Sequence, residues 1–360
     1  MDYINLTEET LRTFTINIFQ AIGVPPDDAR QAADVLLKSD LRGIDSHGIA
    51  RLSGYVRLWE KERINPTPNV RIVHETHSTA TVDGDSGLGL VVAPKAMKIA
   101  IEKAEEHGSG WVSVRNSNHF GIAAYHAMMA LEKDMIGMSM TNASPLVSPT
   151  FSAERLLGTN PICYAFPAGK YPPVIVDMAT AAAANGKLEI AQRTETIIPE
   201  GWIQNKHGHP SADPTELRKG GALLPLGSYP THGSHKGFCL SATVDILSSV
   251  LSGGNYGPWV PPFVAFLEPP SDPVGLGIGH FLGAMRVDGF RPLDEFKHHM
   301  DNWVERFKKA RPIDDTRPVI IPGEPETAAE EERSQHGIPV IRPVYEDLKH
   351  LARKFNIVLD

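Results

Sequence analysis

The sequence predicts a mixed α/β protein of more than one domain that lacks an ordinary dinucleotide-binding fold. Apolar residues alternate between helical and strand-like spacing over most of the chain, a pattern typical of α/β architectures. The chain has 360 residues, more than one small hydrophobic core normally serves. The fingerprint G-x-G-x-x-G is missing, because the nearest stretch, GDSGLG at residues 84–89, holds its glycines in the reverse order.

Three helices are expected near the N-terminus. Thr7 is a candidate cap for the first, and apolar residues follow it at helical spacing: Leu11, Phe14, Ile18 and Ile22. The second helix is expected over residues 26–43 and the third from Ser46. At ~100° per residue, a regular third helix would place His47 and Arg51 about 40° apart, opposite its apolar stripe. The pair would then face either solvent or a cleft.

Strands and helices alternate through the middle of the chain. Strands are predicted at residues 79–82, 111–114, 136–140, 162–166 and 174–177, and helices at residues 91–106, 122–131, 179–190 and 237–251. Gly108 is expected to end the first of these helices. Further on, the sequence predicts an irregular segment at residues 258–277, helices at residues 293–309 and 345–355, and a strand, a turn and a helix start within residues 319–326.

Composition and charge exclude several classes of function. The formal net charge is −8 and no basic block occurs, so no nucleic-acid partner is expected. No apolar run approaches the ~20 residues that span a bilayer, and no secretory signal is visible at the start of the sequence. Cys163 and Cys239 lie outside any C-x-x-C pair and are expected to be buried, reduced thiols. A cytoplasmic protein without a membrane partner is therefore the expectation.

Two histidine-containing stretches are candidates for chemistry. DSHGIAR, residues 45–51, places His47 at an expected helix start, where the positive end of the helix favours a neutral imidazole and a bound carboxylate. Arg51 can grip such a carboxylate with two parallel hydrogen bonds. SNHFG, residues 117–121, follows a predicted strand and precedes a helix, a usual place for binding residues such as His119. For each stretch, a solvated turn or a helix cap is the alternative.

Three further motifs suggest an acid and ligand-binding loops. VDMAT, residues 176–180, ends a predicted strand on Asp177, a usual position for an acid that charge-stabilises a histidine, or for a helix cap. GTNP, residues 158–161, predicts a turn whose backbone can approach a ligand. In HKGF, Lys236 lies at a helix start, where a bound phosphate would offset its unfavourable charge. The nearby histidines lack a third ligand for zinc.

Seven motifs in one order carry a resemblance that none of them carries alone. The order is DSHGIAR, SNHFG, GTNP, VDMAT, PEGW, HKGF and PGEPE, ending at residue 326. It resembles the type-2 malate/L-lactate dehydrogenase family over nearly the whole chain, residues 6–355. The resemblance implies a homodimer with a non-Rossmann fold, discontinuous domains and a largely antiparallel sheet in the cofactor domain. The missing glycine fingerprint agrees with such a fold.

The same resemblance implies a reaction and a division of the chain. The reaction is hydride transfer between a nicotinamide cofactor, NAD or NADP, and a 2-hydroxy acid. A long, histidine-rich stretch at residues 227–237 departs from the family pattern and leaves the choice of cofactor open. The implied parts are a helical N-terminal segment of a substrate and dimer domain (1–70), a cofactor-binding domain (71–110 and 188–290), and the remainder of the first domain with the C-terminal tail (111–187 and 291–360).

Site roles also follow from the resemblance. His47 and His119 are the two alternatives for proton transfer, with His47 taken first, and Asp177 supports His47 electrostatically. The residues implied to bind substrate are Ser46, Arg51 and Asn118. The residues implied to meet the cofactor are Asn160, Asp177, Met178, Ala179, Lys236, Gly237, Gly323 and Glu324. No metal is implied.

Malate and oxaloacetate are the expected substrate pair, and Arg42 and Arg155 are candidates for binding the second carboxylate. The alternatives within the family are lactate, sulfolactate or ureidoglycolate dehydrogenases and reductases of cyclic imines or diketogulonate. From other classes, the alternatives are a metal-dependent hydrolase that uses His47, His119 and Asp177, and a protein that binds NADH without turnover.

Overall fold

One seven-stranded sheet organises the molecule. The computed structural model describes residues 2–314 and 316–359, apart from the side chain of residue 193. The strands are β2 (Arg71–Glu75), β3 (Thr79–Asp83), β4 (Ser109–Ser117), β5 (Met135–Thr141), β6 (Ile162–Phe166), β7 (Val174–Met178) and β11 (Ile278–Arg286), in the order β2-β3-β4-β11-β5-β6-β7. Of these neighbours, only β3 and β4 run parallel. The predicted mixed fold with a largely antiparallel sheet is confirmed.

The strand at the centre of the sheet is one that the sequence did not predict. β11 pairs antiparallel with β4 on one side and with β5 on the other, although it comes far later in the chain. Its sequence, IGHFLGAMR, contains two glycines, which are poor strand formers. Packing requires both, because a Cβ atom at Gly283 would lie 2.4 Å from the Trp111 ring on β4, and one at Gly279 would lie 2.1 Å from the Ser248 carbonyl oxygen. The predicted strands between residues 79 and 177 all form.

Helices cover both faces of this sheet. α4 (Gly89–His107) and α5 (Ala123–Met128) pack on the face that Leu282 lines, whereas the adjacent Phe281 packs with α7 (Ser234–Asp245) and the π-helical segment Ile246–Val250. Gly108 ends α4 with a φ of +85°, as predicted. Small buried side chains allow α4 and α5 to approach the strands closely: Ala93, Ala96, Ala100, Ala104, Ala124 and Ala127.

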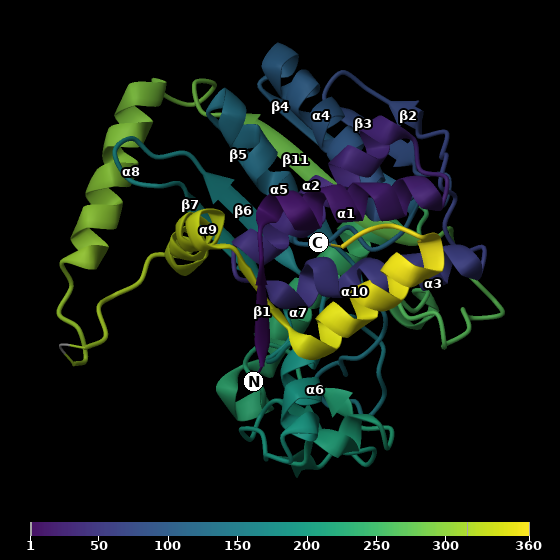
Figure 1. Ribbon diagram of the computed structural model, residues 1–360. Helices are drawn as coiled ribbons and strands as arrows, with labels where there is room; N and C mark the ends of the chain where they lie inside the picture. The colour runs from purple at the N-terminus through teal and green to yellow at the C-terminus, as the bar shows by residue number, and fades with distance from the viewer. Residues whose placement is uncertain (1, 315, 360) are drawn as a thin grey trace.

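A second core joins the N-terminal and C-terminal segments. α1 (Glu8–Ala21), α2 (Pro26–Leu41), α3 (Leu52–Glu60) and α10 (Arg342–Phe355) pack together (Figure 1), and β1 (Tyr3–Leu6) pairs antiparallel with β12 (Ile338–Ile341). Thr7 caps α1 as expected, because its hydroxyl accepts a hydrogen bond from the Thr10 amide at 3.1 Å. This core carries the DSHGIAR stretch between α2 and α3.

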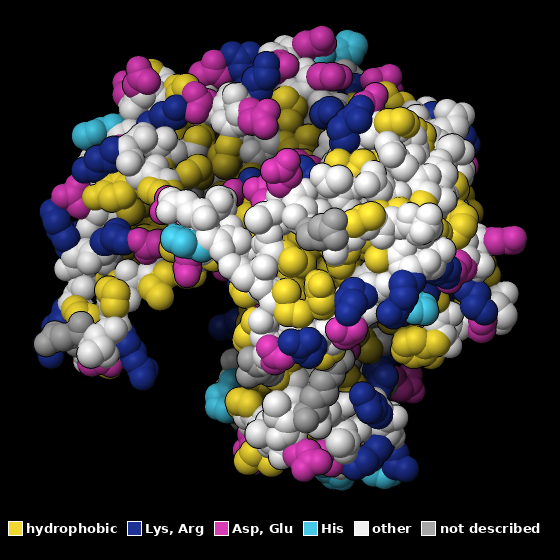
Figure 2. All heavy atoms as spheres, viewed as in Figure 1, with side chains coloured by type: hydrophobic (Ala, Val, Ile, Leu, Met, Phe, Trp, Pro, Cys, Tyr) yellow, Lys and Arg dark blue, Asp and Glu magenta, His cyan; other side chains and the backbone are white. Residues whose placement is uncertain are grey.

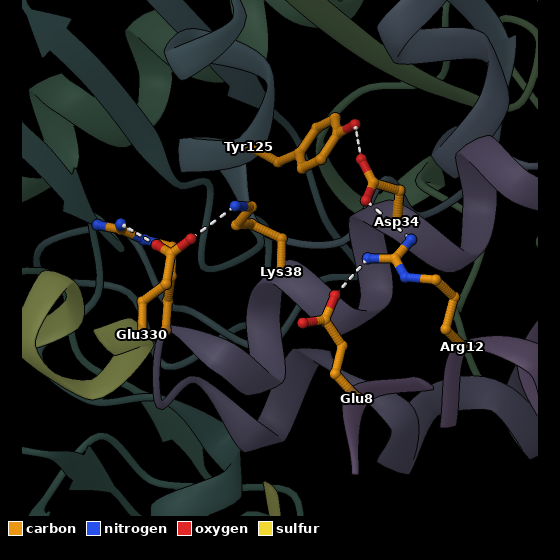
Figure 3. A network of polar contacts seen from close by, with 7 residues as sticks. Glu8, Arg12, Asp34, Lys38, Tyr125 and Glu330 are labelled. Carbon is orange, nitrogen blue, oxygen red and sulfur yellow. Dashed lines mark hydrogen bonds and ion pairs between the residues drawn. The ribbon is translucent and has the colours of Figure 1, made fainter. Parts of the chain in front are cut away.

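A chain of polar contacts links α1, α2 and α5 (Figure 3). Arg12 contacts Glu8 at 2.7 Å and Asp34 at 3.0 Å, and the Tyr125 hydroxyl donates to the second oxygen of Asp34 at 2.6 Å. Such partly exposed ion pairs each contribute only ~0–1 kcal/mol to stability. Their main effect is to fix how α2 lies against α5, the helix that follows His119.

A small lobe lies at the bottom of Figure 1. It contains α6 (Asn185–Arg193) and a sheet of three two-residue strands, β8 (Ile203–Gln204), β9 (Pro210–Ser211) and β10 (Ala222–Leu223). The helix predicted over residues 179–190 begins only at Asn185. The reason is that the backbone before it bonds to other segments, with Thr180 N–H donating to the carbonyl of residue 159 and Ala182 N–H to that of residue 224, at 2.9 and 2.8 Å.

α8 (Leu293–Lys308) forms an arm beside the sheet, and α9 (Glu324–His336) lies closer in, against α2 (Figure 1). Figure 2 shows a deep hollow between this arm and the small lobe. The strand predicted at residues 319–321 does not form, because the segment before α9 meets β7 through one bond, from Ile175 N–H to the Pro322 carbonyl at 3.1 Å. The helix predicted from the acidic residues that follow does form.

The strands of the large sheet come from both predicted domains, since β4 to β7 lie within residues 111–187 or overlap it, whereas β11 lies within residues 188–290. The division of the chain into domains stays a prediction.

Cys163 is buried, but Cys239 is exposed on α7, because it lies on a face of that helix turned away from the sheet; both cysteines are free. In the described part of the chain, no helix combines the length and the apolar character needed to cross a membrane.

Candidate active site

The DSHGIAR stretch forms a broken loop where the sequence predicted a regular helix. Two 3₁₀ turns, Asp45–His47 and Ile49–Arg51, meet at Gly48 before α3 begins. The buried carboxyl of Asp40 explains the break, because it accepts a hydrogen bond from the Ile49 amide at 2.7 Å. A Cβ atom at Gly48 would lie 2.1 Å from Asp40 Oδ1, so glycine is required there. Burial raises the pKa of the Asp40 carboxyl well above its usual range.

This loop brings His47 beside His119, which follows β4. The two ring centroids are 5.6 Å apart and the ring planes differ by 24°. Ser46 Oγ lies 2.9 Å from His47 Nδ1. Burial and the charge of Arg51 lower the pKa of His47 to about 4, and burial, His47 and Arg51 lower the pKa of His119 well below its ordinary value. Both imidazoles are therefore neutral near pH 7.

His119 is held by contacts on its ring face and on one nitrogen. The Tyr55 hydroxyl lies 2.7 Å from Nδ1, and the Gly121 amide donates to the same atom at 3.3 Å. The Phe263 ring stacks on the imidazole with centroids 4.2 Å apart. Burial raises the pKa of Tyr55, so its hydroxyl stays protonated and can donate to Nδ1 or accept from it. Within residues 2–314 and 316–359, no hydrogen bond reaches Nε2, which is left for a ligand.

Arg51 lies next to both histidines. Its Nε donates to the Ser46 carbonyl at 2.6 Å, and its guanidinium carbon is 5.9 Å from the centroid of Phe263. No described residue hydrogen-bonds to its two Nη atoms, which leaves the planar fork for an anion. Ser46 thus connects the two functional side chains, with its hydroxyl on His47 and its carbonyl on Arg51.

Asp177 is the penultimate residue of β7 and does not hydrogen-bond to either histidine in the described structure. Its Oδ2 accepts a bond from the Ala124 amide, at the start of α5, at 3.0 Å. Burial raises the pKa of Asp177 to about 6. The carboxyl lines a cavity of ≈ 370 Å³ between β7, the end of α2 and the start of α9, together with Arg42, Gly323 and Glu326.

The guanidinium of Arg42 in this cavity is only partly satisfied. Arg42 is 4% exposed, and its Nη1 donates to Glu330 on α9 at 3.0 Å. Lys38 contacts the other oxygen of the same carboxylate at 2.6 Å (Figure 3). The Nε and Nη2 atoms of Arg42 are buried without a partner in the described structure, which is uncommon for buried donors. Arg155, by contrast, is occupied by backbone carbonyls of the small lobe, those of Gly221 and Leu217.

Most residues implied to meet the cofactor lie on the segment that follows β7 or at the start of α7, which is close to that segment. The side chain of Asn160 is fully used inside the protein, because Oδ1 accepts from the Ala143 amide and Nδ2 donates to the Ser241 carbonyl, each at 3.1 Å. Thr180, after Met178 and Ala179, bonds through its hydroxyl to the Asn160 carbonyl at 3.0 Å. Its own carbonyl accepts from the amide of residue 226.

The start of α7 abuts the same segment. A Cβ atom at Gly237 would lie 2.2 Å from the Leu226 carbonyl oxygen, so glycine lets α7 approach the backbone. Lys236 is exposed in the first turn, and no side chain caps this helix. The uncapped amides and Lys236 together present positive charge to solvent.

Of three other predicted site residues, Gly323 and Glu324 lie in another part of the structure, and Asn118, next to His119, is used by the backbone. Gly323, with a φ of +89°, starts α9 and lines the cavity of Asp177. The Glu324 carboxylate pairs with Lys308 on α8 and accepts from the backbone amide of residue 321 at 3.1 Å. The Asn118 amide donates to the carbonyls of residues 86 and 87 at 2.9 and 3.0 Å. Asn118 therefore ties the loop after β3 to the loop that carries His119.

Sequence reasoning missed Tyr55 and Phe263, both of which contact His119. Tyr55 lies four residues after Arg51, and this one-turn spacing was the signal that could have identified it. Phe263 lies in the irregular segment 258–277, where no periodic pattern marks any side chain. Its role depends on how that segment folds back.

The arrangement can hold an anion and move a proton. The Arg51 fork suits a carboxylate, and the free Nε2 atoms of His47 and His119 can exchange a proton with an oxygen nearby. The described residues contain no cluster of three or more His, Cys, Asp and Glu side chains that could hold a metal ion.

Comparison with known proteins agrees with this geometry. A model of the family described as malate/L-lactate dehydrogenase matches residues 6–349. A malate dehydrogenase of Pyrococcus horikoshii is 42% identical over 99% of this chain and 97% of its own. A malate/(S)-sulfolactate dehydrogenase of Methanothermus fervidus is 39% identical over 98% and 99%. The crystal structure of a malate dehydrogenase from Entamoeba histolytica superimposes with a TM-score of 0.92 at 34% identity, covering 99% of each chain.

The fold and these likenesses define an oxidoreductase that acts on the CH–OH group of a 2-hydroxy acid. The chain belongs to the malate/L-lactate dehydrogenase family. Dehydrogenases of this family use a nicotinamide cofactor, and membership removes the hydrolase alternative.

Proposed function

We propose that this protein interconverts malate and oxaloacetate with NAD or NADP. The observation that carries the proposal is the free fork of Arg51 beside two neutral imidazoles, which suits an acid whose carboxylate adjoins its hydroxyl. The relative of Pyrococcus horikoshii is named a malate dehydrogenase. The relative of Methanothermus fervidus is named for both malate and (S)-sulfolactate, so sulfolactate is the second candidate substrate.

We assign the substrate carboxylate to Arg51 and proton transfer to His119. His119 is preferred over His47 because contacts on its Nδ1 and ring face fix its orientation, with Nε2 left free. When Nε2 takes up the substrate proton, Nδ1 carries the other ring hydrogen and the Tyr55 hydroxyl accepts from it; the Gly121 amide bond to Nδ1 belongs to the other tautomer. His47 then contributes a hydrogen bond to the substrate. An anion on Arg51 would offset the charge that lowers the pKa of both histidines, which brings His119 closer to the range useful for proton transfer.

The start of α7 fits the diphosphate of a dinucleotide. The helix has 12 residues, no capping side chain and an exposed Lys236 in its first turn, a combination that favours a bound phosphate. Lys236 and Gly237 would hold the diphosphate, and Met178 and Gly323 would contact the cofactor from the wall of the Asp177 cavity. The nicotinamide supplies the hydride when bound.

We also infer a homodimer that buries the α8 arm. Three large apolar side chains are exposed there, Phe290 at 76%, Trp303 at 41% and Phe307 at 45%. The rings of Trp303 and Phe307 lie 4.3 Å apart, and Figure 2 shows apolar side chains along the arm. Exposed apolar patches of this kind mark interfaces. Light scattering of the Trp303→Glu variant is expected to give half the mass of the wild type; equal masses would contradict this interface.

The experiment that tests the proposed function is the rate of NADH and NADPH oxidation with a panel of oxaloacetate, pyruvate, sulfopyruvate and a cyclic imine. Fast turnover of oxaloacetate is expected. Turnover of sulfopyruvate alone would favour the second candidate. Turnover of the cyclic imine alone, or of none of the four, would refute the assigned substrate while leaving the family unchanged.

A further inference from the structure

We propose that Phe263 is a positioning residue of this active site, whose ring orients His119 and Arg51 together, and that Arg63 holds Phe263 in place. The inference rests on the proposed function, because it gives Phe263 a part in the proposed reaction. Phe263 comes from the irregular segment 258–277, which carries no other group of the site.

The ring of Phe263 lies between His119, Tyr55 and Arg51. It is nearly parallel to the His119 imidazole, with planes 25° apart and centroids separated by 4.2 Å. It meets the Tyr55 ring edge-on at 5.2 Å, and the guanidinium of Arg51 lies over it at 5.9 Å. A Cβ atom at Gly54 would be 3.7 Å from the Phe263 ring, so the ring rests directly on α3.

These contacts restrict two freedoms that matter for catalysis. The stacked ring stops the imidazole of His119 from rotating about its bond to the chain, so the Nε2 atom keeps one direction. Attraction between the guanidinium and the ring face keeps Arg51 beside that atom. The same ring also covers the imidazole face and keeps water from it. A single apolar side chain therefore sets the relative placement of the proton-transfer and carboxylate-binding groups.

Arg63 explains how an irregular segment can hold the Phe263 ring in a fixed position against His119. Its guanidinium donates to backbone carbonyls on both sides of Phe263: those of Pro262, Val264 and Leu267. The Phe263 amide donates to Ser144 Oγ at 3.1 Å, which adds a second attachment. Phe266, three residues after Phe263, is by contrast 81% exposed.

The test compares substitutions at Phe263 with one at Phe266, a phenylalanine of the same segment that touches no site residue. Phe263→Ala is expected to lower kcat/KM for oxaloacetate ~30- to 100-fold. It is also expected to raise the apparent pKa in the pH profile of kcat/KM, because water then reaches His119. Phe263→Tyr keeps the flat ring and should recover the wild-type pKa and most of the activity. Phe266→Ala should leave rate and profile unchanged.

Removing the Arg63 hydrogen bonds that hold the Phe263 backbone should reproduce part of this effect. Arg63→Ala is expected to lower kcat/KM less than Phe263→Ala does. The double variant should lose no more activity than Phe263→Ala alone, because both changes disturb the same placement of the ring. If Phe263→Ala does not fold, Phe263→Leu replaces it, with circular dichroism as the check. A Phe263→Ala variant with the wild-type pH profile and kcat/KM would overturn the proposal.

A direct readout separates this proposal from the proposed function. The ¹⁵N resonances of His119, assigned by comparison with the His119→Asn variant, report its titration without any substrate. An upward shift of this pKa in Phe263→Ala, absent in Phe266→Ala, is expected. If the wild type reduces no 2-oxo acid but the shift is seen, the proposed function fails and the positioning role stands. If turnover is normal but the shift is absent, the positioning role fails alone.

Discussion

Gly48→Ala should damage both stability and catalysis through one contact. The added Cβ atom would lie 2.1 Å from Asp40 Oδ1, whereas ordinary contacts begin near 3.4 Å, so the carboxyl must retreat by about 1.3 Å. That movement breaks the 2.7 Å bond from the Ile49 amide and leaves a buried donor unpaired. The lost bond and the unpaired amide together cost about 3 kcal/mol. A displacement of ~1 Å in the loop that carries His47 and Arg51 should lower kcat/KM ~100-fold.

Urea unfolding followed by circular dichroism measures the first effect, and initial rates with oxaloacetate measure the second. Gly54→Ala is the matched control, because its Cβ would meet Phe263 at an ordinary 3.7 Å and alanine favours the helix. This control should gain ~0.5–1 kcal/mol. Wild-type stability and activity in Gly48→Ala would refute the reasoning that the Asp40 contact requires glycine and shapes the loop.

Three further predictions test the side chains around the loop. Arg51→Leu should raise KM for the 2-oxo acid ~100-fold, with partial recovery in Arg51→Lys, because the bidentate charge-assisted contact is lost; steady-state kinetics would disprove the role by an unchanged KM. His119→Asn should lower kcat ~10³-fold and His47→Asn mainly raise KM, and the reverse pattern would exchange their roles. The pKa of Asp177, about 6, lies above its ordinary value, so its negative charge destabilises the folded state as pH rises. Asp177→Asn should therefore gain free energy of unfolding relative to the wild type between pH 4 and pH 8. Urea titrations at the two pH values measure this, and a pH-independent difference would contradict it.

Local periodicity was sufficient to predict the elements whose burial matches their spacing. α4 and β6 appear where predicted because each has one continuous buried pattern and clear ends, such as Gly108. β11 was missed because its glycines are required by tertiary contacts, Gly283 by the Trp111 ring and Gly279 by the Ser248 carbonyl, which sequence spacing does not contain. The helix expected from Ser46 begins only at Leu52 for a similar reason, because a buried carboxyl from α2 bonds the backbone of the preceding turn.

The candidate site likewise contains residues that the sequence could identify and contacts that it could not. Motif order was enough to select His47, His119 and Arg51, which the structure brings together. The contacts of His119 with Tyr55 and Phe263 join segments separated by many residues, and no local pattern encodes them. Tertiary contacts thus decide which nitrogen of His119 is free, whereas Nδ1 of His47 meets the hydroxyl of the adjacent Ser46.

The late position of β11 in the chain has a consequence for biosynthesis. β4 and β5 do not pair with each other, and each pairs instead with β11, whose His280 also bonds Ser117, two residues before His119, at 2.8 Å. Until residue 286 has left the ribosome, both strands expose an unpaired edge, which invites aggregation. Pairings between such distant segments also make folding slow. His119 is therefore set in place only after residue 286 has been synthesised, and nascent chains that stop short of β11 are expected to need a chaperone.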